Sequence, residues 1–133
     1  MKRIFVLFTF SLLKILNSIE ISHEDLKNLI ENIESAIEIR DITGLESHFH
    51  NRFEYRELSQ KMERSEFLYQ MLNEKNRTKW KYSESSSRRT RYGAIFSIFE
   101  AHQFFVHYRV RRIDGKEGLK IFYAENDEEK KFV

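Results

Sequence analysis

The chain has 133 residues, of which 23 are Lys or Arg and 21 are Asp or Glu, and it contains no Cys and no Pro. This length indicates one small domain, and 41% apolar and 14% aromatic residues are more core-forming material than a disordered chain carries. The absence of Cys excludes a disulfide framework, a Cys-ligated zinc site and a Cys nucleophile. A net charge of only +2 argues against a nucleic-acid partner.

Two basic residues precede an apolar run at residues 4–13, and Lys14 ends the run. This pattern is typical of a secretory signal, and the run is about half as long as a membrane-spanning helix needs. We therefore predict a signal peptide over residues 1–21, cleaved between about residues 16 and 22, and a secreted, extracellular protein without a stable membrane anchor. An uncleaved N-terminal anchor is the alternative. The mature domain is predicted over residues 22–133, long enough to build a core without disulfides.

The mature chain begins with three predicted helices. Ser22 is followed three residues later by an acidic residue, as in a capping box, at the start of a long amphipathic helix. Asp41 is the predicted N-cap of a short second helix that carries Phe49 and Phe53 toward the core, and Ser65 is the predicted cap of the third. The apolar positions of the three helices are Leu26, Leu29, Ile30, Ile33, Ile37, Leu45, Phe67, Leu68, Met71 and Leu72.

Beyond Asn76 the apolar period changes from 3.6 to 2, which indicates strands. The four predicted strands cover residues 78–82, 92–99, 104–111 and 119–123. Asp114-Gly115 predicts a hairpin turn between the last two strands, and the serine- and arginine-rich residues 85–91 predict a solvated loop. Helices followed by antiparallel strands indicate an α+β fold, with the helices on one face of a curved sheet.

The order of these elements resembles the nuclear transport factor 2-like superfamily. The similarity covers residues 23–125 and rests on the Arg40-Asp41 turn, the short helix opening with Gly44-Leu45, the Phe67-Leu68 helix and the strands that follow. With a signal in front, the chain is most similar to the small secreted, uncharacterised branch. A cystatin-like fold is the rival, but its single helix does not match three predicted helices.

The resemblance implies a cone-shaped, curved antiparallel sheet of about four to five strands packed against three N-terminal helices. It also implies a mouth that can hold a small ligand, and dimerisation through the outer face of the sheet. Relatives include isomerases, dehydratases, epoxide hydrolases and non-catalytic binding domains, so the fold alone does not choose among functions.

Strand alternation predicts an aromatic interior for the cone. The residues predicted to line a pocket there are Tyr55, Trp80, Tyr82, Phe96, Tyr108 and Tyr123. A filled core without a pocket is the alternative, since buried tyrosines need only one hydrogen-bond partner.

Acid–base groups are scarce in this predicted interior. Glu84 and Glu100 share the inward parity but are expected at strand ends, on the rim, and Tyr55 is the remaining candidate. We therefore predict no catalytic residues and no cofactor, leave enzymatic activity open, and favour a non-catalytic role. A small lyase or isomerase is the alternative.

The five histidines do not form a predicted metal site. His48 and His50 lie two residues apart and would point in different directions on a helix, while His23, His102 and His107 are scattered. No metal is therefore predicted.

Basic side chains of the outward parity predict a basic surface on the sheet. These residues are Lys79, Lys81, Arg109, Arg111 and Lys120. Interleaved with Phe105 and Phe122, they suit a homodimer interface or an acidic extracellular partner such as a sulfated polysaccharide.

Asn76-Arg77-Thr78 is a sequon, which predicts N-glycosylation of a secreted chain.

The near-neutral charge hides two opposed halves. Residues 23–74 carry 6 basic and 12 acidic side chains, whereas residues 75–133 carry 14 and 8. We expect an acidic helical layer and a basic sheet. The sequence thus favours a secreted, non-enzymatic domain that binds a partner protein or a small apolar ligand, with the lyase or isomerase and a polyanion-binding module as alternatives.

Overall fold

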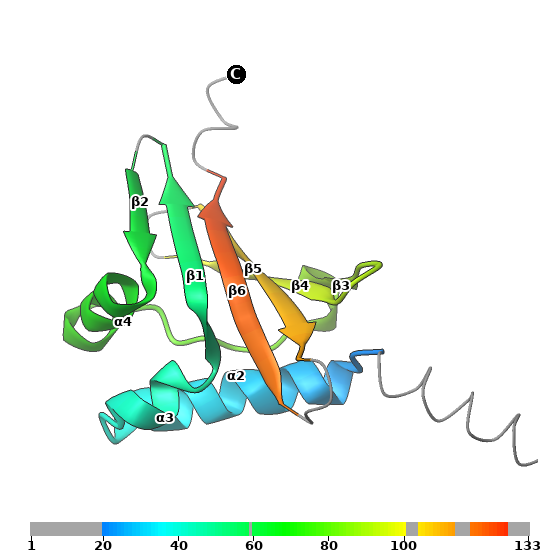
Figure 1. Ribbon diagram of the computed structural model, residues 1–133, viewed down its shortest axis with the longest axis horizontal. Coiled ribbons are helices and arrows are strands. Elements are labelled where there is room, and N and C mark those ends of the chain that lie inside the picture. The colour runs from blue at the N-terminus through cyan, green and yellow to red at the C-terminus, as the bar shows by residue number, and fades with distance from the viewer. Residues whose placement is uncertain (1–19, 59, 101–103, 114–117, 128–133) are drawn as a thin grey trace, which may run out of the picture.

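The computed structural model describes residues 20–58, 60–100, 104–113 and 118–127 (Figure 1). It is an α+β fold with one six-stranded sheet in the order β2-β1-β6-β5-β4-β3. The helices are α2 (His23–Glu38), α3 (Ile42–Glu46), α4 (Arg64–Asn73) and the short 3-10 helix η1 (Glu84–Ser86). The strands are β1 (Phe49–Glu57), β2 (Gln60–Glu63), β3 (Ser87–Arg89), β4 (Ala94–Phe99), β5 (Phe105–Arg112) and β6 (Leu119–Asn126).

The first two helices begin as predicted. Ser22 Oγ accepts a hydrogen bond from the Asp25 N–H, and Asp25 Oδ2 accepts one from the Ser22 N–H, both at 3.0 Å. These two bonds complete the capping box of α2. Asp41 caps α3 by accepting from the Gly44 N–H at 3.0 Å. Arg40, between the two helices, has a left-handed φ of 56°, which turns the chain sharply.

The region between α3 and α4 differs from the prediction. Phe49 and Phe53 do not end a helix but lie in β1, which forms an unpredicted hairpin with β2. A spacing of four residues returns to the same face in a helix and in a strand, so this pair cannot distinguish the two. The helix α4 begins at Arg64, one residue before the predicted cap Ser65, and its N-cap Glu63 makes no side-chain cap bond.

The sheet has more strands than the predicted four to five, and it is mixed rather than antiparallel. β1 runs parallel to β6, whereas the pairs β6–β5, β5–β4 and β4–β3 are antiparallel. The predicted strand at residues 78–82 is an extended segment that pairs with no described strand. Residues 87–89, expected in a loop, form the edge strand β3. The predicted turn at Asp114-Gly115 lies outside the described residues.

Alternation is confirmed in β4 and β5 but fails in β6. The inward residues Ala94, Phe96, Ile98, Val106, Tyr108 and Val110 are all buried. In β6 the pairing changes between Arg109↔Tyr123 and Val110↔Ile121, so Phe122 is an extra residue in the ladder. This bulge reverses the parity that follows, and Tyr123 therefore faces outward instead of inward.

The core lies between the sheet and the helices. Figure 1 shows α2 running crosswise beneath β1, β6 and β5, with α4 beside β1 and β2. The sheet takes strands from both charge halves of the chain, so the expected acidic helical layer and basic sheet do not separate. Ile21 is 2% exposed and belongs to the core, although the predicted domain begins one residue later. No helix within the described residues is long and apolar enough to cross a membrane.

Candidate functional site

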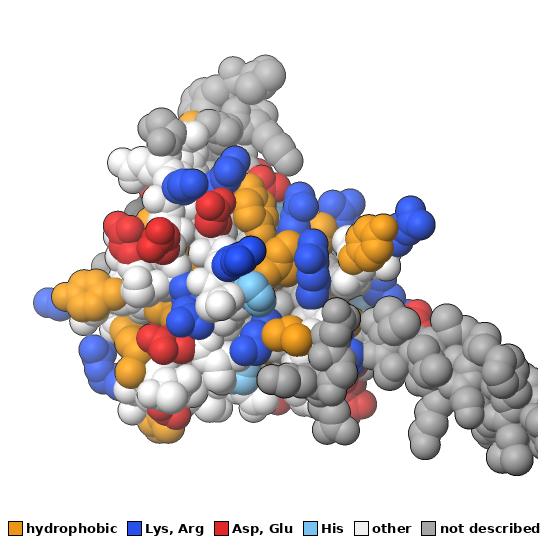
Figure 2. All heavy atoms as spheres, viewed as in Figure 1, with side chains coloured by type: hydrophobic (Ala, Val, Ile, Leu, Met, Phe, Trp, Pro, Cys, Tyr) orange, Lys and Arg blue, Asp and Glu red, His pale blue; other side chains and the backbone are white. Residues whose placement is uncertain are grey.

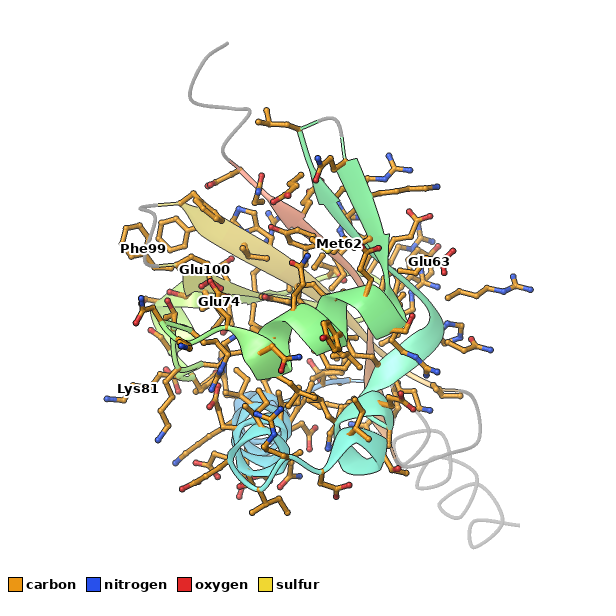
Figure 3. All side chains as sticks on the ribbon, turned by 90° about the vertical axis from the view of Figure 1, so that its left-hand side faces the viewer. Met62, Glu63, Glu74, Lys81, Phe99 and Glu100 are labelled. Atoms are coloured by element: carbon orange, nitrogen blue, oxygen red, sulfur yellow. The ribbon has the colours of Figure 1, made fainter. Side chains whose placement is uncertain are left out.

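A pocket of about 200 Å³ lies between α4 and the inner face of the sheet. Its lining comes from four separate parts of the chain: the β1–β2 hairpin, α4, the extended segment after α4, and the β4–β5 region. Figure 3 views this side of the molecule, with the lining residues Met62, Glu74 and Glu100 labelled. The fold therefore assembles the pocket from elements that are distant in sequence.

Aromatic rings form the deep wall of the pocket. The ring centroids of Tyr108 and Trp80 lie 4.4 Å apart. Behind them in the core, Phe96 stacks on Tyr108 with a centroid distance of 5.1 Å. Phe67 of α4 lies 5.1 Å from Tyr55 of β1. These contacts fix the orientation of the rings, so the wall is rigid and largely apolar.

A polar cluster lies at the β1 side of the pocket. Tyr55 Oη donates to Glu57 Oε2 at 3.2 Å, and Asn126 Nδ2 donates to Tyr55 Oη at 3.2 Å and to Glu57 Oε2 at 3.4 Å. Asn126 is 8% exposed, and its Oδ1 is buried without a hydrogen-bond partner among the described residues. Tyr55 and Glu57 line the pocket, and Asn126 supports them from β6.

Arg77 is held at the other side of the pocket by Glu34 of α2. The guanidinium donates to Glu34 Oε1 at 2.7 Å and to Oε2 at 2.6 Å, and the Trp80 N–H donates to the same carboxylate at 2.7 Å. Both side chains of the ion pair are largely buried. A bidentate, largely buried ion pair of this kind holds the extended segment, and with it the Trp80 ring, against α2.

The phenols of the pocket remain protonated at neutral pH. Burial raises the pKa of Tyr55, and the negative charges of Glu57 and Glu100 raise it further against the effect of the Asn126 hydrogen bond. Burial, with Glu100, also raises the pKa of Tyr108. Hydrogen bonding to Glu34 raises the pKa of Arg77, which stays charged. The tyrosines can donate hydrogen bonds here but are poorly suited to act as bases.

The structure places three of the six predicted pocket residues in the lining: Tyr55, Trp80 and Tyr108. Phe96 is buried behind the wall, and Tyr123 faces outward because of the β6 bulge. Tyr82 lies away from the pocket, where its hydroxyl contacts His23 Nδ1.

Of the predicted acid–base candidates, Glu100 lines the pocket with Tyr55, whereas Glu84 is exposed in η1. The sequence reasoning missed Glu57, Glu74 and Arg77. Glu57 shares the strand parity of Tyr55, two residues away, so an assignment of residues 49–57 to a strand would have found it.

The predicted basic surface divides into two parts. Arg109, Arg111 and Lys120 lie on the outer face of β5 and β6, with Arg111 directly opposite Lys120. Lys79 and Lys81 lie in the extended segment before η1 and not on the sheet. Period-2 alternation also arises in an extended segment that pairs with no described strand, which is why the sequence placed them together.

Arginines on the outer face stack on aromatic rings. The Arg109 guanidinium lies 5.2 Å from the Tyr123 ring centroid, and that of Arg111 lies 4.0 Å from Phe122. Figure 2, which looks at this side, shows Lys and Arg side chains interspersed with hydrophobic ones over β5 and β6. Arg109 also lies 3.8 Å from Glu125, so the face is mixed rather than uniformly basic.

The histidines of the described residues lie on different elements, and the sequon residue Asn76 lies in a turn. Burial, together with the charge of Lys120, lowers the pKa of His48, while His107 Nδ1 lies 2.6 Å from Ser97 Oγ. His102 lies outside the described residues, within which no group of three or more His, Asp or Glu is placed to hold a metal ion. Asn76 is exposed in the turn after α4.

No protein-family model matches the chain, and no curated protein matches it. Among solved structures the chain is similar to an NTF2-like protein of unknown function from Cytophaga hutchinsonii, with a TM-score of 0.47 and 14% identity over 86% of this chain and 97% of that chain. That protein carries the family name that the sequence resemblance indicates, and a likeness of this size says nothing about ligand or activity.

Proposed function

We propose that this domain is a non-catalytic binding module that takes a small, largely apolar ligand into the pocket between α4 and the sheet. The pocket itself carries the proposal, because it is concave, has a rigid aromatic wall and holds a few polar groups at its sides. These are the features by which small-molecule sites are recognised.

The acid–base chemistry of the pocket favours binding over catalysis. Its two tyrosines have raised pKa values and remain protonated, and no histidine contributes to the described lining. A tyrosine that stays protonated can donate a hydrogen bond to a ligand but is a poor general base.

Trp80 is the single tryptophan of the chain and lines the pocket, so its fluorescence reports on occupancy. Titration with propylbenzene, a neutral apolar probe, is expected to change the Trp80 emission saturably. Gln70→Phe, which places a ring at an exposed lining position of α4, should abolish the change, whereas Tyr69→Phe, at an exposed position outside the lining, should not. An unsaturable response of the wild-type chain would contradict the proposal.

A small lyase or isomerase is the second candidate, favoured by the shared position of Tyr55 and Glu100 in the pocket. In this case a carboxylate would remove a proton and the Tyr55 hydroxyl would donate to the developing oxyanion. The measurement is turnover across a panel of small apolar carbonyl and hydroxy compounds, compared between the wild-type chain and Glu100→Gln. Equal background rates in both would remove this candidate.

We also propose that the domain is secreted and glycosylated at Asn76. The two basic residues and the apolar run that follows them at the N-terminus support secretion. The exposed turn position of Asn76 would let a glycosylating enzyme reach its side chain. Because Ile21 is part of the core, a cleavage that leaves the domain intact must come before it. Expression in a secreting eukaryotic cell should release the protein into the culture medium. Treatment with an N-glycosidase should lower the apparent mass of the secreted protein, and Asn76→Gln should abolish this change. Retention of the full-length chain inside the cell would oppose secretion.

The outer face of the sheet supports a further partner proposal, a homodimer or an acidic extracellular polymer. Exposed Phe99 and Phe105, 5.0 Å apart between ring centroids, lie near the arginine-bearing part of β5. Sedimentation at increasing concentration distinguishes the two: a dimer changes mass without a ligand, whereas polymer binding needs the added polyanion.

A further inference from the structure

The ionisable lining of the pocket is predominantly acidic. Glu57, Glu74 and Glu100 contribute three carboxylates, and Arg77 contributes the single cation among the described lining residues. The charge of Arg77 is already compensated, because two hydrogen bonds of 2.7 and 2.6 Å join it to Glu34, which lies outside the lining. The Arg77–Glu34 pair therefore adds no net charge to the pocket, and the three glutamates leave its described lining acidic.

Within the described part of the chain, the hydrogen-bond partners of Glu57 carry no positive charge. Glu57 accepts hydrogen bonds from Tyr55 and Asn126, both neutral, and neither Glu57 nor Glu74 forms an ion pair within the described part of the chain. Burial raises the pKa of Tyr55 and of Tyr108, and the negative charge of Glu100 raises both further, against the charge of Arg77 at Tyr108. The interior thus has a negative potential that an anionic ligand would oppose.

Aromatic rings add a second preference of the same sign. Tyr55, Phe67, Trp80 and Tyr108 all line the pocket, and the face of an aromatic ring attracts a cation. Asn126 is not part of the lining but holds the Tyr55–Glu57 pair through its Nδ2 group. Rings and carboxylates together favour a ligand that is positively charged and donates hydrogen bonds.

We propose that the ligand of this pocket is a small organic cation with an apolar body, in the class of protonated arylalkylamines. The ammonium group lies toward Glu57 and the neighbouring glutamates, and the apolar body contacts the aromatic wall. This inference rests on the proposed binding function and specifies the charge of the ligand.

Three probes of nearly equal size test the charge preference: phenethylammonium, its neutral isostere propylbenzene, and the anion 3-phenylpropionate. Binding is followed by Trp80 fluorescence and by calorimetry at neutral pH. We expect phenethylammonium to bind about tenfold more tightly than propylbenzene, and 3-phenylpropionate to bind least, because carboxylates and ring faces favour the cation.

Glu57→Gln is the diagnostic variant, since its amide oxygen can still accept from Tyr55 while the charge is removed. It should lower the affinity for phenethylammonium about tenfold and that for propylbenzene much less, because propylbenzene carries no charge for Glu57 to attract. The control is Glu54→Gln on the same strand, which lies outside the pocket lining and should change neither affinity. A thermal melt of each variant verifies that the fold is retained.

The outcomes separate this inference from the proposed function. If propylbenzene binds as tightly as phenethylammonium, the charge preference is wrong and the apolar binding function stands. If 3-phenylpropionate binds most tightly, Arg77 dominates the pocket and the inference is overturned. If no probe binds, both proposals fail.

Discussion

The strands β4, β5 and β6 carry aromatic rings on both faces of the sheet, and the rings on the two faces have different neighbours. On the inner face Phe96 and Tyr108 contact each other and the Trp80 ring of the extended segment, and all three are almost fully buried. On the outer face Phe122 and Tyr123 lie under the guanidinium groups of Arg111 and Arg109. The inner rings therefore serve the core and pocket, and the outer rings serve a solvated surface.

The charges of the two faces differ in the same way. The inner ion pair of Arg77 and Glu34 is largely shielded from water, and its two charges are joined by two hydrogen bonds. The outer pair of Arg109 and Glu125 is about 3.8 Å apart and considerably exposed. Shielded pairs are costly to break, whereas exposed pairs contribute little to stability. The outer face can therefore vary for binding at little cost in stability, whereas the inner face cannot.

The largest effect is expected from removing an inner ring. Phe96→Ala should lower the free energy of unfolding by about 3–5 kcal/mol, because it leaves a cavity between Trp80 and Tyr108. Phe105→Ala, on the outer face of the neighbouring strand and 38% exposed, should cost less than about 1 kcal/mol. Urea denaturation of both variants measures the difference. Similar losses would mean that the outer face is covered in solution.

The next effect comes from the inner ion pair. Glu34→Ala leaves the Arg77 guanidinium and the Trp80 N–H without their acceptor and should cost about 3 kcal/mol. Glu31→Ala, on the exposed face of the same helix, is the control and should be nearly neutral. The Trp80 emission of Glu34→Ala should also shift to longer wavelength as the ring gains access to water. An unchanged melting temperature for Glu34→Ala would show that the pair does not anchor the segment.

The inner face could be predicted from the sequence wherever one period was unbroken. The stripe of α2 and the alternation of β4 and β5 each have a single interpretation, and the structure confirms both. Phe49 and Phe53 have a spacing that suits helix and strand equally, so β1 and β2 were missed. Glu57 lies in that hairpin, which is why it was not predicted to line the pocket.

The outer face was harder to predict because it depends on pairing. The bulge at Phe122 is set by the register of β6 against β5, and it turns Tyr123 outward. The parallel pairing of β1 with β6 is likewise a property of the tertiary fold. Asn126 and Glu57, which meet across that pairing, are 69 residues apart in sequence, so no local pattern could have joined them.

A smaller effect concerns the edge where α2 meets the sheet. Burial acts to raise the pKa of Asp25, but hydrogen bonds from Ser22 and the charge of Arg112 outweigh it and lower this pKa below its ordinary value of 3.8. The ionised form therefore stabilises the fold at higher pH, and this contribution is lost as the pH falls through the lowered pKa. Because the side chain is partly exposed, we expect less than about 1 kcal/mol. Asp25→Asn should lower stability at pH 6, with a smaller difference from wild type at pH 3.

The smallest effect on stability is expected from the outer arginines, which instead affect binding. Arg109→Ala with Arg111→Ala should change the free energy of unfolding by no more than about 0.5 kcal/mol per site, because both side chains are exposed. The double variant should nevertheless elute from heparin at lower salt than the wild-type chain, since it removes two basic groups from this face. Lys79→Ala with Lys81→Ala removes the same charge from a segment outside the sheet and should change the elution less. Equal shifts for the two double variants would show that heparin responds to net charge and that the outer face is not a specific surface.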